Sequence, residues 1–236
     1  MGIFTYTPIH KNSHFDMRKI QITKSILLLT TLILFVQFTE SHAQQWKEVK
    51  NENDIKIFRA VNEETGTQVF KVDFYLETGD ILAPIAMLKN VVEYPKWLSN
   101  IESAQMMEAR DSSYWAYKFK VRVGPSLKYG YAKVKIDINK EQTKVHYKMR
   151  PKEFIDNSKH HDFKKIEDFK SDWYFTAMPD GKIKVEYCSY LITSSYLLDL
   201  MARGRFEECL FSTAMAMREK VTDQKYDFLS FSDINF

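Results

Sequence analysis

The sequence predicts an α+β fold in which a curved antiparallel sheet is covered by a long C-terminal helix. Two observations lead to this fold class. Segments in which apolar and polar residues alternate fill most of residues 55–192, which is the pattern of half-buried strands. From about residue 196 to residue 225 the apolar residues recur at helical spacing instead. Meandering strands followed by a helix are typical of α+β folds and not of α/β folds.

The alternating segments predict about seven or eight antiparallel strands. In one of them, Trp115, Tyr117 and Phe119 share a face. Pro179-Asp180-Gly181 predicts a hairpin turn before the last strand, and residues 44–53 form only a short leading segment. The expected strands are residues 55–61, 67–76, 103–109, 113–121, 128–138, 143–149, 172–178 and 182–192, with 163–169 as a candidate edge strand.

Two helices are expected. Asp80 can cap a short helix that ends near Asn90. In the long C-terminal helix, Gly204 predicts a kink or a break. The apolar stripe of that helix comprises Leu200, Met201, Leu210, Phe211, Ala214, Met217 and Val221. Its charged residues predict a solvated face or local ion pairs, and they are Asp199, Arg203, Glu207 and Glu208.

Residues 1–43 have the organisation of a secretory signal peptide. Arg18, Lys19 and Lys24 precede an uncharged run at residues 25–38, and Ser41-His42-Ala43 follows with small residues at the cleavage positions. We expect cleavage after Ala43, export to the periplasm or the medium, and a single mature domain at residues 44–236. A retained membrane anchor is the alternative, although a spanning helix needs about 20 apolar residues.

The first 16 residues do not fit the basic start of a signal peptide, because they are mixed, aromatic and include Asp16. Met17-Arg18-Lys19 fits better, and we interpret Met17 as the candidate true start. Residues 1–16 would then come from a mis-assigned gene start. Sequencing the N-terminus of the uncleaved precursor tests this hypothesis, which a precursor beginning at Met1 would contradict.

The charge of the predicted mature chain gives no reason to expect a nucleic-acid partner. Residues 1–43 hold four of the 34 Lys and Arg residues and two of the 31 Asp and Glu residues. The mature chain therefore carries 30 basic and 29 acidic side chains. A nearly neutral chain lacks the basic surface of a nucleic-acid-binding protein. Its length is that of one domain, which we expect to be a monomer.

The aromatic strand faces and the methionines of the C-terminal helix raise the possibility of a ligand cavity. Met201, Met215 and Met217 lie on the helix, and methionine adapts to varied apolar shapes. A packed core is the alternative, since such residues usually form one. The candidate cavity residues are Trp97, Trp115, Tyr117, Phe119, Tyr147, Met149, Trp173, Phe175 and Tyr187 on the sheet side, and Met201, Leu210, Ala214 and Met217 on the helix.

The order of features resembles the START (StAR-related lipid-transfer) family of the helix-grip superfamily, over the whole predicted mature chain. No single motif carries the resemblance. The matching segments are Trp46-Lys47-Glu48-Val49, Ile55-Lys56-Ile57-Phe58, Val69-Phe70-Lys71-Val72, residues 81–88 with Val91-Val92, Tyr94-Pro95-Lys96-Trp97, residues 114–119 before Gly124-Pro125-Ser126, Gly181 with Val185-Glu186-Tyr187, and the final helix.

The resemblance implies a curved sheet wrapped around the C-terminal helix, with a cavity between them for a lipid or another hydrophobic molecule. It also implies that the helix and neighbouring loops act as a gate, and it is compatible with transient contact with a membrane surface. Two segments depart from the family. Leu127-Lys128-Tyr129-Gly130 stands where Arg-Asp is common, and Thr193-Ser194-Ser195 replaces a Gly-Pro-rich approach to the helix.

Signatures of catalysis, metal binding or cofactor binding are absent from the sequence, so we expect binding without catalysis. An enzyme similar to the polyketide cyclases and aromatases of the same superfamily is the alternative. His160-His161-Asp162 predicts a solvated loop, because adjacent strand residues point to opposite faces. His146 is expected to be exposed on a polar strand face.

Cys188 and Cys209 are expected to stay unpaired. Cys188 shares the polar strand face of Lys184 and Glu186. A sheet would then separate it from a helix packed on the opposite face, whereas a disulfide needs Cα atoms within about 7 Å. A disulfide between the two is the alternative.

Overall fold

The computed structural model describes residues 45–63, 65–111, 113–123, 125–141, 143–154, 164–166, 168–191 and 196–223. The side chains of residues 123, 190–191 and 196–203 lie outside this description. So do the predicted signal peptide, with its cleavage site at Ala43, and His160-His161-Asp162. The segment Thr193-Ser194-Ser195 is outside it as well.

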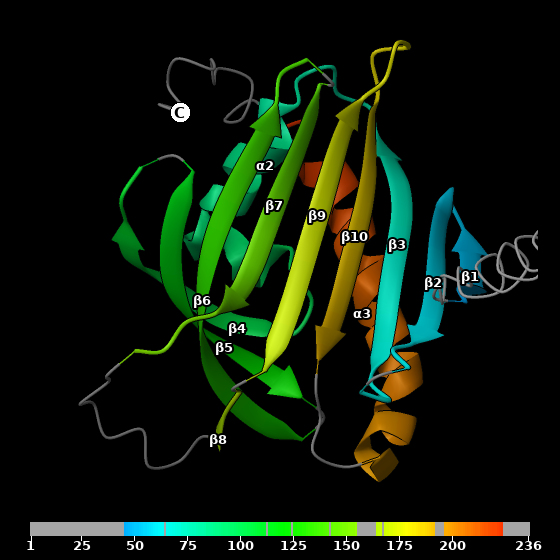
Figure 1. Ribbon diagram of the computed structural model, residues 1–236, viewed down its shortest axis with the longest axis vertical. Helices are drawn as coiled ribbons and strands as arrows, with labels where there is room; N and C mark the ends of the chain where they lie inside the picture. The colour runs from blue at the N-terminus through cyan, green and yellow to red at the C-terminus, as the bar shows by residue number, and fades with distance from the viewer. Residues whose placement is uncertain are drawn as a thin grey trace, which may run out of the picture. The chain divides into compact units, whose positions relative to one another are not determined.

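The domain is built on a single ten-stranded sheet, whose order is β1-β2-β3-β10-β9-β7-β6-β5-β4, with β8 paired to β6 (Figure 1). All neighbours are antiparallel except the β6–β8 pair, which is parallel. The strands are β1 (Lys47–Glu52), β2 (Ile55–Val61), β3 (Gln68–Leu76), β4 (Ile101–Ala109), β5 (Tyr114–Val123), β6 (Ser126–Asn139), β7 (Lys144–Pro151), β8 (Lys164–Lys165), β9 (Phe169–Ala177) and β10 (Ile183–Leu191).

The α+β class is confirmed, but the expected number of strands is too low. The missing strand, β1, lies in the leading segment and pairs with β2 across an irregularity between Glu48 and Lys50. Its residues are half-buried or exposed on both faces, so the sequence shows no apolar alternation there. The predicted edge strand at 163–169 shrinks to β8, and Phe169 begins β9 instead.

The described residues also form two α-helices and a 3-10 helix: α2 (Leu82–Lys89), η1 (Val91–Lys96) and α3 (Tyr196–Lys220). The N-cap of α2 is Ile81, not the predicted Asp80. The Asp80 carboxylate nevertheless accepts a hydrogen bond from the Leu82 N–H at 2.8 Å, just before the helix. The predicted break at Gly204 is wrong, because α3 is continuous through it. A kink at this glycine stays a prediction.

Both α-helices pack on the same face of the sheet, where Figure 1 shows them behind the strands. The strand faces predicted from alternation are confirmed by burial: Trp115 and Tyr117 on β5, Tyr147 on β7 and Phe175 on β9 all belong to one apolar core. The register aligns Tyr147 with Trp173, and Trp173 with Tyr187. Large aromatic side chains therefore form a continuous row across the middle of the sheet.

The last turns of α3 are fixed to the β2–β3 end of the sheet by Arg218. Its guanidinium donates to the backbone carbonyls of Tyr75 at 2.9 Å, Asp54 at 3.0 Å and Asn53. Asn53 and Asp54 form the turn before β2, with φ of 51° and 55°. Since one side chain satisfies three carbonyls, the end of the helix and the turn hold each other in place.

Two acidic residues of α3 bind the sheet. Glu207 pairs with Arg59 at 3.4 Å, and Glu208 pairs with Lys50 at 3.0 Å. Local ion pairs that involve Asp199 or Arg203 stay a prediction. Sequence spacing indicates only neighbours within a helix, so these long-range partners could not be predicted. Asp199 and Arg203 have side chains outside the described part.

The outer face of the sheet is polar but not fully solvated. His146 was expected to be exposed, yet its ring stacks on Tyr174 at 4.1 Å and its Nε2 lies 2.9 Å from Asp172. Arg150 donates to both carboxylate oxygens of the same aspartate, at 2.9 and 3.0 Å. Burial lowers the pKa of His146, and Asp172 opposes that effect.

Within the described residues, no helix is long and apolar enough to cross a membrane.

Candidate ligand cavity between sheet and C-terminal helix

A cavity of about 150 Å³, partly open to solvent, lies between the inner face of the sheet, the segment from α2 to β4, and the middle of α3. The strands β5, β7, β9 and β10 supply its sheet side. Its lining residues are Leu88, Tyr94, Leu98, Ser99, Ile101, Tyr117, Phe119, Tyr147, Met149, Ser171, Trp173, Tyr187, Phe206, Cys209, Leu210 and Thr213. The wall is therefore mostly apolar and aromatic, as in small-molecule sites.

The structure divides the sequence-predicted candidates into two groups. Those in the cavity wall are Tyr117, Phe119, Tyr147, Met149, Trp173, Tyr187 and Leu210. Those buried in the packed core and absent from the wall are Trp97, Trp115, Phe175, Ala214 and Met217. The Met201 side chain lies outside the described residues, and Met215 is 38% exposed and does not face the core. A role in ligand binding stays a prediction for every one of them.

Several wall residues escaped the sequence analysis. Tyr94 sits in η1, between α2 and β4, where no alternating or helical pattern marks an inward side chain. Ser171 lies on the inner face of β9, one residue before the strand predicted at 172–178 begins. Phe206 and Thr213 could have been found, because they continue the spacing of Leu210 along the helix.

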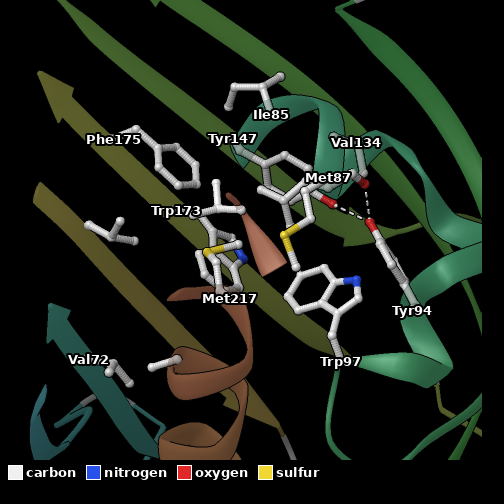
Figure 2. Close-up of a cluster of buried hydrophobic side chains, with 14 of the residues drawn as sticks. Val72, Ile85, Met87, Tyr94, Trp97, Val134, Tyr147, Trp173, Phe175 and Met217 are labelled. Carbon is white, nitrogen blue, oxygen red and sulfur yellow. Dashed lines mark hydrogen bonds between the residues drawn. The ribbon is translucent and has the colours of Figure 1, made fainter. Parts of the chain in front are cut away.

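Three tyrosine hydroxyl groups meet beside the cavity. Tyr94 donates to the backbone carbonyl of Leu88, and its hydroxyl oxygen lies 3.4 Å from that of Tyr147 (Figure 2). Tyr117 donates to the Met149 thioether at 2.9 Å. The rings of Tyr94 and Tyr117 also meet edge to face, with centroids 5.4 Å apart. The apolar wall therefore contains one polar cluster, formed by η1, β5 and β7.

Burial keeps these phenols neutral. It raises the pKa of Tyr94, Tyr117 and Tyr147 well above the ordinary value, since a phenolate would lose its hydration. Burial also raises the pKa of Tyr187, and hydrogen bonds with Ser189 and Ser171 partly oppose this rise. At neutral pH the cluster can donate hydrogen bonds, but it cannot serve as a base.

The described wall contains no Asp, Glu, Lys, Arg or His side chain. General acid–base catalysis needs a group that titrates near the working pH. No group of three or more His, Cys, Asp or Glu residues in the described ranges could hold a metal ion. Both cysteines are free, with Cys209 in the cavity wall and Cys188 on the other face of the sheet. The described wall is therefore suited to holding an apolar molecule.

The size of the cavity limits what this form of the protein can hold. Sites for drug-sized ligands measure about 300–1,000 Å³, whereas an apolar cavity of about 150 Å³ holds a molecule the size of benzene. As it stands, the cavity accommodates a small apolar molecule or one part of a larger one. A lipid would require the wall to move outward.

No family model and no curated protein matches the chain. Solved structures do match. A STAR-related lipid transfer protein from Xanthomonas axonopodis has a TM-score of 0.63 and 16% identity, covering 75% of this chain and 99% of its own. Human StAR-related lipid transfer protein 5 has a TM-score of 0.62 and 11% identity, with 85% and 97% covered. Human STARD10 has a TM-score of 0.63 and 8% identity, with 82% and 80% covered. The chain therefore has the START-like helix-grip fold.

Proposed function

We propose that the domain at residues 44–236 binds a lipid or another hydrophobic small molecule, without catalysis, in the cavity between the sheet and α3. One observation carries this proposal: the buried apolar core contains a cavity whose described wall is mostly aromatic and apolar and carries no charged side chain. Burying apolar surface contributes about 25 cal/mol per Å². The fold, shared with proteins named for lipid transfer, supports the same function.

Binding of a lipid-sized molecule requires an opening, and we place it at the middle of α3. Around Phe206 to Thr213 the helix is held by the part-buried ion pair of Glu207 and the more exposed pair of Glu208. Asn100 Nδ2 also donates to Cys209 Sγ at 2.6 Å, and the Ser99 N–H lies 3.4 Å from Thr213 Oγ1. An exposed ion pair contributes little, about 0–1 kcal/mol. The end of the helix is held more firmly by Arg218, so α3 would tilt about that end.

The first test is native mass spectrometry of the protein purified from its own host. A bound hydrophobic species is expected, and lipid extraction would identify it. Cys209 offers a second, direct readout because it lies in the cavity wall. In a Cys188→Ser variant, ligand should slow thiol labelling of Cys209. Protein that is free of ligand, and whose labelling no lipid slows, would contradict the proposal.

The alternative, an enzyme of the cyclase and aromatase type, gains no specific support. Such a reaction needs a general base beside the substrate, and the wall as described supplies only tyrosine, serine, threonine and cysteine hydroxyl or thiol groups. Export, the monomeric state and transient membrane contact stay predictions. An N-terminus at Gln44 in protein recovered from the periplasm or medium would support the predicted signal peptide.

A further inference from the structure

The tyrosine cluster is a feature that an entirely apolar ligand would not use. Tyr94, Tyr117 and Tyr147 are each at least 96% buried, and their hydroxyl groups gather at one side of the cavity. Burying a hydroxyl group costs free energy unless it finds a partner. Their placement therefore raises the question of which partners they hold now, and which they would hold with a ligand.

The three hydroxyl groups differ in the quality of their partners. Tyr94 is satisfied, because it donates to the Leu88 carbonyl. Tyr117 donates to the thioether of Met149, and sulfur in a thioether is a weak acceptor. Its other partners are the hydroxyl groups of Tyr94 and Tyr147 in the same cluster. Tyr147 has the Tyr94 oxygen at 3.4 Å, well beyond the 2.7–2.8 Å at which such bonds usually form. Tyr117 and Tyr147 would therefore gain from a better acceptor.

Charge limits the ligand further. Among the lining residues that the structure describes, none carries a formal charge at neutral pH. A carboxylate, phosphate or ammonium group drawn into the cavity would lose its hydration without a counter-charge. A neutral oxygen would lose much less and would meet the two donors.

We propose that the cavity selects an uncharged hydrophobic molecule with a hydroxyl or carbonyl oxygen, which accepts hydrogen bonds from Tyr117 and Tyr147. The inference rests on the proposed function and adds the class of ligand. The hydrocarbon part of the ligand lies against Phe119, Trp173 and Leu210, at the apolar side of the wall. An ionised lipid head group does not enter.

Three small probes of related shape test this selection: cyclohexanol, cyclohexane and cyclohexanecarboxylate at pH 8. Their affinities are measured by calorimetry and by the labelling rate of Cys209 in the Cys188→Ser background. Cyclohexanol should bind at least tenfold more tightly than the carboxylate. In Tyr117→Phe/Tyr147→Phe, the affinity for cyclohexanol should fall roughly three- to tenfold, the usual effect of a lost hydrogen bond. The affinity for cyclohexane should be unchanged.

Tyr75→Phe is the matched control, because Tyr75 is 40% exposed and does not line the cavity. It should bind all three probes like the wild type. Cyclohexane binding also reports whether the double variant keeps its cavity, and Tyr117→Phe alone serves if the double variant does not fold. If the carboxylate binds as well as cyclohexanol, or the double variant keeps its affinity for cyclohexanol, the ligand class is wrong and the proposed function stands. If no probe binds the wild type, both are overturned.

Discussion

The two ends of the apolar core are built from the same strands, and the cavity described above lies at one of them. At the packed end, Trp115, Phe175 and Val185 are fully buried, and so is Met217 of α3, which belongs to the same apolar core. Figure 2 shows Phe175 and Met217. Two residues further along each strand face, the cavity begins at Tyr117, Trp173 and Tyr187. The ends thus share secondary structure and burial, and differ in how completely side chains fill the space.

The end of the core that holds α3 in place and the end that contains the cavity are different parts of this domain. The packed end has large apolar side chains on both layers, and Arg218 fixes α3 beside it. The cavity end has phenol and serine hydroxyl groups on the sheet, and its side of the helix carries Cys209 and Thr213. Phe206 and Leu210 of the helix complete this wall. A fixed end and a hollow end on one helix are what a tilting gate requires.

The largest expected difference between the ends comes from removing a phenylalanine. Phe175→Ala should lower the free energy of unfolding by about 3–5 kcal/mol, because it opens a new void in a filled region. Phe119→Ala should cost less, about 1–3 kcal/mol, since one side of the ring already borders the cavity. Urea unfolding of both variants checks this, and equal losses would contradict the division into two ends.

Adding a side chain should have opposite effects at the two ends. Ala214 is buried in the packed core, so Ala214→Leu should destabilise the protein by about 1–3 kcal/mol. Cys209→Leu places its extra carbon atoms in the cavity, so it should stabilise the protein by about 1 kcal/mol and weaken ligand binding. Thermal unfolding and cyclohexanol titration measure the two effects. A destabilised Cys209→Leu would mean that the wall cannot accept added volume.

Alkaline pH should act mainly on the cavity end, because the buried phenols lie there. Their pKa values in the folded protein are raised above the unfolded value, so the folded state holds more protons above about pH 10. The stability they contribute is complete below that pH and is lost as the pH rises. The slope is up to about 1.4 kcal/mol per pH unit for each phenol.

Tyr147→Phe should therefore flatten the loss of stability above pH 10, which chemical denaturation at several pH values measures. Burial also raises the pKa of Cys188, on the outer face, to about 11, and this contribution is the same in both proteins. Tyr75→Phe, at an exposed position, should keep the wild-type slope. An unchanged slope in Tyr147→Phe would show that this hydroxyl is not buried in the folded state.

The fold could be predicted from the sequence, but only part of the cavity wall could. The alternation of apolar and polar residues located most strands and their inner faces, because this pattern arises wherever one face of a strand is buried and the other is not. The same alternation runs through Trp115 at the packed end and Tyr117 in the wall, so it cannot say where the core is hollow. Tyr94 was missed because a 3-10 helix imposes no long periodic pattern. Partners far apart in the sequence, such as Arg59 and Glu207, leave no local signal.

The smallest effect concerns Gly130, which stands opposite Phe119 on the neighbouring strand. A Cβ at Gly130 would come within 2.6 Å of Cζ of the Phe119 ring, so the ring covers the glycine and Gly130→Ala must displace it. The cavity beside the ring gives it room to move, which should limit the loss of stability to about 1 kcal/mol. The displaced ring should occupy part of the cavity and weaken binding of cyclohexanol.

Gly204→Ala is the matched control, because Gly204 lies in α3 with open space where a Cβ would be added. This substitution should raise the free energy of unfolding by about 0.5–1 kcal/mol without changing binding. If Gly130→Ala bound cyclohexanol like the wild type, Phe119 would not control the volume of the cavity.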